Sequence, residues 1–192
     1  MAYPLVKRIS PEIYLEEERK STVKHQYFDG EVVAMAGASI AHNTIVSNII
    51  GEIRDFLKGK NCNIFPSDLR VSIPSADTYT YPDATIICGQ PEATDEQRDT
   101  IKNPSVIFEV LSGTTRNYDT GKKFLFYQRI PSLKEYILID STQRSVAVYE
   151  RRENELWKIK VIEDTHGKLV ISSIGFTLSF DELYRNIIFP ET

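Results

Sequence analysis

The sequence predicts a domain of the α/β or α+β class. Residues 39–57 carry apolar side chains at the spacing of a helix with one buried face. Residues 105–111 form a nearly continuous apolar run, which is typical of a central strand covered on both sides. The predicted elements follow one another as helix, strands, helix, strands. Because the 192 residues contain no repeat, low-complexity tract or linker, we expect a single domain over residues 1–192.

The N-terminal region predicts a short helix followed by a β-hairpin. Ser10 can cap the helix, and Pro11 suits its first turn, where a backbone N–H would have no partner. Further on, Asp29 and Gly30 stand between two apolar runs, a pairing that favours a tight hairpin turn. Glu31 then opens the second strand of that hairpin.

The long helix should begin after Ser39, which can cap it, and end near Leu57. Its apolar positions repeat at the helical period. His42 lies one turn before Val46 and two turns before Ile49, so we expect its imidazole to face inward.

The remainder of the chain predicts strands separated by polar loops. We expect strands at about 62–73, 83–88 and 105–111, a helix over about 119–129, and further strands at 135–140, 145–150 and 156–163. Ser179 should open a last helix with a capping box.

Composition limits the class of protein. The net charge of −4 argues against a surface that grips any polynucleotide through positive charge alone. Cys62 and Cys88 show no metal-binding spacing, and we expect them to be free thiols in a reducing compartment. No apolar run reaches the roughly 18 residues that span a bilayer, so we expect a cytoplasmic protein without a membrane partner.

Two carboxylates beside apolar strands are the residues most suggestive of chemistry. Glu109 interrupts the run 105–111, where a charge is costly unless a partner offsets it. Asp83 precedes the apolar strand that follows it. If the two strands are neighbours, both carboxylates meet at one sheet edge, where a hard divalent cation such as Mg²⁺ would hold them together. The alternatives are a turn residue for Asp83 and a structural ion pair for Glu109.

Several longer motifs carry a resemblance to a known family. The matching segments are 28–31, 39–42, 66–68, 81–83, 103–112, 118–123 and 130–136, together with Tyr127. They resemble the Uma2 family, within the wider PD-(D/E)XK nuclease fold. The likeness covers about residues 10–185, and the stretch 103–136 is its most specific part.

This resemblance implies a restriction-endonuclease-like core, a mixed β-sheet flanked by helices, and a site at its edge. Asp83 and Glu109 would bind the metal, with the backbone carbonyl of Val110 as a third ligand. The wider superfamily places a lysine two residues after the glutamate, where this sequence has Leu111. The lysine matching the family's displaced position is Lys123, which would orient the attacking water and stabilise negative charge. Asp83, Glu109 and Lys123 are therefore the predicted catalytic residues.

Three further residues are candidates for supporting roles. Glu31 matches a glutamate of the family and is either a further ligand or an exposed hairpin residue. His42 is either a hydrogen-bond partner of a ligand carboxylate or a satisfied core histidine. Asp68 lies between apolar strand residues and is a candidate neighbour of the site.

The function that the resemblance implies is a metal-dependent endonuclease that hydrolyses phosphodiester bonds in DNA with Mg²⁺, or with Mn²⁺ in its place. It also implies a homodimer, since folds of this type often pair to cut two strands. A catalytically inactive nuclease fold that binds nucleic acid or another protein is the competing hypothesis, favoured by the acidic balance and by Leu111. A third hypothesis is hydrolysis of a smaller phosphodiester.

Overall fold

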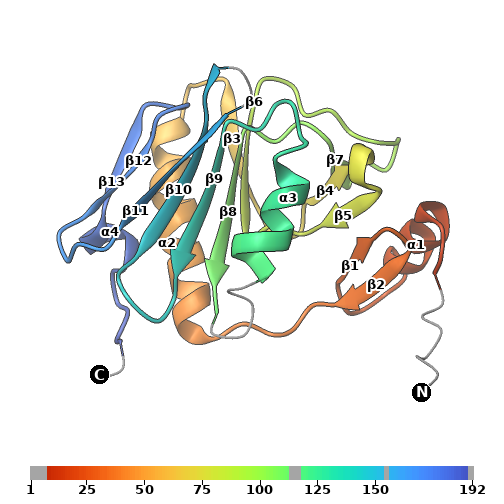
Figure 1. Ribbon diagram of the computed structural model, residues 1–192, viewed down its shortest axis with the longest axis horizontal. Coiled ribbons are helices and arrows are strands. Elements are labelled where there is room, and N and C mark those ends of the chain that lie inside the picture. Colours follow the sequence, from red (N-terminus) through yellow and green to blue (C-terminus); the bar gives the residue numbers. More distant parts are fainter. Residues whose placement is uncertain (1–7, 113–117, 154–155, 190–192) are drawn as a thin grey trace.

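A six-stranded mixed sheet forms the centre of the protein (Figure 1). The structure is a computed structural model that describes residues 8–112, 118–153 and 156–189. Helix α2 (Ile40–Leu57) covers one face of this sheet, and the short helix α3 (Phe124–Tyr127) lies against the other. The strand order is β11 (Trp157–Ile162), β10 (Val146–Arg151), β9 (Glu135–Asp140), β8 (Val106–Leu111), β6 (Ala84–Cys88) and β3 (Cys62–Pro66).

The register of this sheet places strand β8 at its centre. Strands β8 and β9 run parallel, whereas β6 pairs with β8 in the antiparallel sense. All six residues of β8 are buried, as expected for a strand with a layer on each face. The predicted mixed sheet flanked by helices is therefore confirmed. The strand after Asp83 neighbours the strand that carries Glu109, which is the condition under which the two carboxylates meet at one sheet edge.

Helix α2 forms because its apolar residues fall on one stripe. Ser39 caps it by accepting a hydrogen bond from the His42 N–H, and Ile45, Ile49 and Ile53 are at most 1% exposed. Each of these isoleucines contributes on the order of 1.5–3 kcal/mol by leaving water. The helix thereby fixes its first turn, which carries His42, against the central sheet.

A second sheet of five strands lies beside the first, with helix α1 (Pro11–Glu18) packed on it (Figure 1). The predicted hairpin is confirmed, and its two turn residues both have positive φ, 46° at Asp29 and 93° at Gly30. The strand order is β2 (Glu31–Ala34), β1 (His25–Phe28), β5 (Thr78–Thr80), β4 (Arg70–Ile73) and β7 (Thr100–Ile101).

The core on the α3 side joins the two sheets. Val71 and Ile73 of β4 share a buried apolar cluster with Ile107 of β8 and Leu138 of β9. The third sheet is the hairpin of β12 (Lys168–Ile171) and β13 (Phe176–Ser179), and α4 (Phe180–Leu183) follows with the predicted capping box at Ser179.

Two predicted elements differ from the structure. The expected strand 62–73 is divided by a turn, in which the Leu69 N–H donates to the Pro66 carbonyl, so that β3 and β4 belong to different sheets. The expected helix 119–129 is a π-helical turn, Tyr118–Lys123, that continues into α3. Arg151 donates to the carbonyls of residues 128, 130 and 133 and so holds the end of this helical segment against β10.

The prediction of free thiols is wrong. Cys62 and Cys88 form a disulfide that joins the edge strand β3 to β6. The antiparallel register places the two residues directly opposite each other, with Cα atoms 4.0 Å apart. The disulfide removes the support that free thiols would give to a reducing compartment, and the cytoplasmic location stays a prediction.

Within the described ranges, no helix combines the length and the apolar character needed to cross a membrane.

Candidate active site at the edge of the central sheet

Glu109 is a buried carboxylate whose negative charge is balanced by Lys123. The Lys123 ammonium lies 2.6 Å from Glu109 Oε1, and each side chain is 5% exposed. Glu109 reaches this position because β8 directs it towards the α3 side, and Lys123 because the π-helical turn ends there. Lys122 is exposed, as expected for its neighbour on a helical turn. Breaking a buried pair of this kind costs about 3–5 kcal/mol.

Tyr127 adds a second polar contact to Glu109. Its hydroxyl lies 2.9 Å from Glu109 Oε1 and 3.0 Å from the Thr80 hydroxyl. A carboxylate only accepts hydrogen bonds, so the phenol donates to Glu109, and Thr80 can donate to the phenol oxygen. Burial, together with the negative charge of Glu109, holds the pKa of Tyr127 well above its usual range. Tyr127 is therefore a fixed neutral donor.

Asp83 stands immediately before β6 and is held by two hydrogen bonds to its Oδ2 atom. The Val110 N–H donates at 2.7 Å, and His42 Nε2 lies 3.2 Å away. The side chains of His42 and Asp83 are 14% and 16% exposed. The prediction that His42 faces inward is confirmed, and the first turn of α2 places it on the carboxylate that the sequence singled out.

The strand register brings Asp83 and Glu109 to neighbouring positions. The antiparallel pairing of the two strands ends with Ala84 and Phe108, and Asp83 and Glu109 are the next residues beyond that pair. The N–H and C=O of one strand residue point to the same side, so the Val110 carbonyl is directed, like its N–H, towards Asp83.

Two of the predicted supporting residues lie apart from these contacts. Asp68 is in the turn after β3, where its side chain is 83% exposed and pairs with Lys24 at 2.5 Å. Glu31 is exposed at the start of β2, opposite Phe28. The structure thus brings together Asp83, His42 and Val110 at one point and Glu109 with Lys123 at the next, whereas Asp68 and Glu31 make other contacts.

The donors at this edge suit a hard divalent ion. Asp83, Glu109 and the Val110 carbonyl supply oxygen ligands only, and Mg²⁺ commonly takes one or two carboxylates while keeping several waters. In the part of the chain that the structure describes, no group of three His, Cys, Asp or Glu side chains gathers around one point. A closed cage of protein ligands is thus absent there, whereas a water-rich Mg²⁺ site fits these residues.

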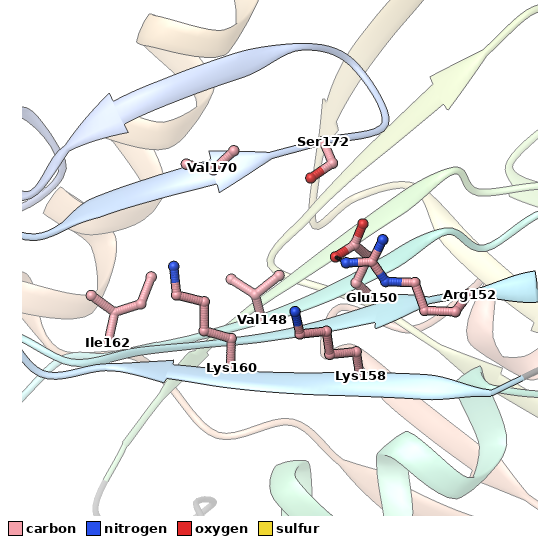
Figure 2. Close-up of a pocket in the computed structure, with 8 residues that line it drawn as sticks. All are labelled: Val148, Glu150, Arg152, Lys158, Lys160, Ile162, Val170 and Ser172. Atoms are coloured by element: carbon pink, nitrogen blue, oxygen red, sulfur yellow. Dashed lines mark hydrogen bonds and ion pairs between the residues drawn. The ribbon is translucent and has the colours of Figure 1, made fainter.

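A separate groove lies between the outer strands of the central sheet and the β12–β13 hairpin (Figure 2). Its cavity volume is about 230 Å³, and Lys158 and Lys160 point into it while Glu150 pairs with Arg152 at 2.7 Å. Its remaining lining residues are Val148, Ile162, Val170 and Ser172. None of the predicted site residues lines this groove, so it is distinct from the sheet edge.

Two residues that contact the site, Tyr127 and Thr80, were not among the predicted site residues. Tyr127 lies four residues after Lys123, so a shared helix face was visible, but its bond to Glu109 was not. Thr80 carried no signal, because its place beside Tyr127 depends on the packing of the two sheets.

Comparison with known proteins gives consistent matches. A family model named Uma2 and described as "Putative restriction endonuclease" matches residues 11–181. The chain is 34% identical over 182 residues to uncharacterized protein slr1290 of Synechocystis sp., covering 95% of this chain and 94% of that protein. It is 33% identical to uncharacterized protein sll1609 of the same organism, covering 83% of this chain and 90% of that protein.

A solved structure shares the fold. It is the crystal structure of a protein from Anabaena variabilis described as a putative nuclease belonging to DUF820, with a TM-score of 0.74. The match covers 91% of this chain and 98% of that one at 19% identity. The family match spans most of the sequence and agrees with the fold, and the chain belongs to the Uma2 family.

Proposed function

We propose that the protein is a metal-dependent endonuclease that hydrolyses phosphodiester bonds in DNA. Asp83 and Glu109 would hold a divalent ion, Mg²⁺ or Mn²⁺, with the Val110 carbonyl as a third oxygen ligand. Membership of a family described as restriction endonucleases supports the reaction class. The residues at the sheet edge support the assignment of the site.

The roles of the side chains follow from their surroundings. When bound, a divalent ion would neutralise charge on the phosphate and lower the pKa of water. Lys123 would orient the attacking water and stabilise the charge that builds on the phosphate oxygens. Tyr127 fixes Glu109 by a hydrogen bond, and His42 with the Val110 N–H fixes Asp83.

One observation carries the proposal, namely the burial of Glu109 against Lys123 at the strand position next to Asp83. A structural ion pair alone would not call for a second carboxylate on the neighbouring strand. That second carboxylate adds negative charge to a mostly buried site, and a cation offsets it.

Supercoiled plasmid DNA tests the reaction. With Mg²⁺ or Mn²⁺ the wild type should nick or linearise it, and chelation should stop the cleavage. Asp83→Asn, Glu109→Gln and Lys123→Met should each slow cleavage by about 100-fold or more, whereas Lys122→Met should leave the rate unchanged. Nicking that survives Glu109→Gln would refute the assignment of this site. Cleavage of a model phosphodiester but not of DNA would favour a smaller substrate.

A catalytically inactive nuclease fold that binds nucleic acid or a protein is a second candidate. It is favoured by the contacts of Glu109, whose Oε1 already receives Lys123 and Tyr127. Calorimetric titration separates the two functions, because an inactive scaffold should show no Mg²⁺ or Mn²⁺ binding that depends on Asp83.

We also propose that two copies of the chain act together to cut both strands. The outermost strand of the central sheet supports this, since Ile159 and Val161 on β11 are 54% and 57% exposed. Analytical ultracentrifugation should show a dimer, and a monomer at assay concentrations that still linearises plasmid would contradict the pairing.

A further inference from the structure

Gln26 of strand β1 has a buried amide oxygen whose hydrogen-bonding capacity is unused. Its Oε1 atom is shielded from solvent and has no hydrogen-bond partner among the described residues. An amide oxygen in this state destabilises the fold, because it has lost water without gaining a donor. Buried polar atoms are nearly always paired, so this exception calls for an explanation.

The pairing of β1 with β5 shows where the Gln26 side chain points. Tyr27 pairs with Tyr79, and Gln26 and Thr80 are the next residues beyond that pair on the two neighbouring strands. The rings of Tyr27 and Tyr79 contact each other and Tyr14 of helix α1. Because successive strand residues alternate between faces, Gln26 and Thr80 point to the face away from α1.

That opposite face is the one that meets the candidate active site. Phe28, two residues after Gln26 and on the same face, stacks on Phe126 of α3 at 5.7 Å between ring centroids. The Thr80 hydroxyl lies 3.0 Å from the Tyr127 hydroxyl, which in turn lies 2.9 Å from Glu109. The face of the second sheet that carries Gln26 and Thr80 therefore packs against the side of the central sheet that carries Glu109.

We propose that Gln26 is a further residue of the active site and that its amide oxygen accepts a hydrogen bond from a water of the ion-binding site. The inference rests on the proposed metal-dependent function and adds a residue from the N-terminal hairpin to it. A water needs two or more polar partners to be held in a protein interior, and Gln26 and Thr80 offer two from adjacent strands. A water in this position would give the buried Gln26 oxygen the donor that it lacks among the described residues.

Gln26→Leu separates this role from a structural one, because it removes the oxygen and keeps most of the volume. In the presence of a chelator, the urea midpoint of the Gln26→Leu variant should equal or exceed that of the wild type, because the variant lacks the buried oxygen that has no hydrogen-bond partner. Its affinity for Mn²⁺, measured by calorimetry without DNA, should fall about tenfold or more. Gln26→Glu keeps an acceptor at this position and should bind Mn²⁺ at least as tightly as the wild type.

Asn48→Leu is the matched control, since it replaces a buried amide that is satisfied. The Asn48 amide donates to the backbone carbonyls of Leu183 and Arg185, which belong to the C-terminal part of the chain and not to the candidate site. The urea midpoint of the Asn48→Leu variant should fall while its affinity for Mn²⁺ stays unchanged. This is the reverse of the pattern expected for Gln26→Leu.

The outcomes distinguish this inference from the proposed function. If the wild type binds Mn²⁺ in a manner that depends on Asp83, but Gln26→Leu binds equally well, only the role of Gln26 is refuted. A lower midpoint for Gln26→Leu with unchanged affinity would likewise make Gln26 a structural residue. If the wild type binds no metal, the proposed function fails and the role of Gln26 fails with it.

Discussion

Replacing Lys123 with methionine should destabilise the metal-free protein by about 3–5 kcal/mol. The ammonium and Glu109 Oε1 are 2.6 Å apart, and each side chain is 5% exposed. At an effective dielectric constant of about 20, their attraction is on the order of 6 kcal/mol. The measured loss should be smaller, because the variant no longer has to bury the ammonium. Methionine fills a similar volume, so the loss of charge balance dominates.

Urea denaturation in chelator measures this effect. Lys122→Met is the matched control, because it makes the same substitution at the adjacent exposed position and should shift the free energy of unfolding by at most about 0.5 kcal/mol. The double variant Glu109→Gln with Lys123→Met should recover much of the loss, since no uncompensated carboxylate remains. A Lys123→Met variant within about 1 kcal/mol of the wild type would refute the view that this pair is buried and interdependent.

Three further changes should alter stability in ways that the structure specifies. Tyr127→Phe removes the hydroxyl that contacts Glu109 and should lower the free energy of unfolding in urea by about 1–3 kcal/mol. Burial raises the pKa of Tyr81 to about 12. The stability that the neutral Tyr81 hydroxyl contributes should be fully present below pH about 10 and should be lost as the pH rises towards about 12. The urea midpoints of the wild type and of Tyr81→Phe should therefore converge over that range. Reduction of the Cys62–Cys88 disulfide, which closes a loop across a sequence separation of 26, should cost about 3–4 kcal/mol, measured by unfolding with and without reductant.

Each of these changes has a control or a contrary outcome. For Tyr127→Phe the control is Tyr149→Phe, because none of the described residues hydrogen-bonds that hydroxyl in the structure and its loss should matter little. A midpoint difference for Tyr81→Phe that is independent of alkaline pH would show that the phenol ionises equally in the folded and unfolded states. Identical unfolding curves with and without reductant would show that the two sulfurs are not joined in solution.

The parts of the fold that sequence alone predicted are those set by local patterns. The Asp29-Gly30 turn requires positive φ at both residues, and few other residue pairs accept that conformation. Helix α2 follows from the 3.6-residue spacing of its isoleucines and from the Ser39 cap. Glu109 was visible because a charge inside an apolar strand is rare without a partner.

The parts that sequence did not predict depend on contacts between distant segments. The disulfide of Cys62 and Cys88 follows from the register of β3 on β6, which two isolated cysteines do not reveal. The division of the predicted strand 62–73 between two sheets depends on which neighbours each half finds. The burial of the Gln26 amide oxygen was hidden for the same reason, since a polar residue in a hairpin strand is ordinarily an exposed one.

The central claim is that Asp83 and Glu109 together hold a divalent ion. Anomalous diffraction from crystals soaked in Mn²⁺ tests it most directly. We expect a single strong peak within coordination distance of both carboxylates and of the Val110 carbonyl. The claim would be contradicted if crystals soaked in saturating Mn²⁺ showed no peak at this edge of the sheet and Glu109 remained bonded to Lys123.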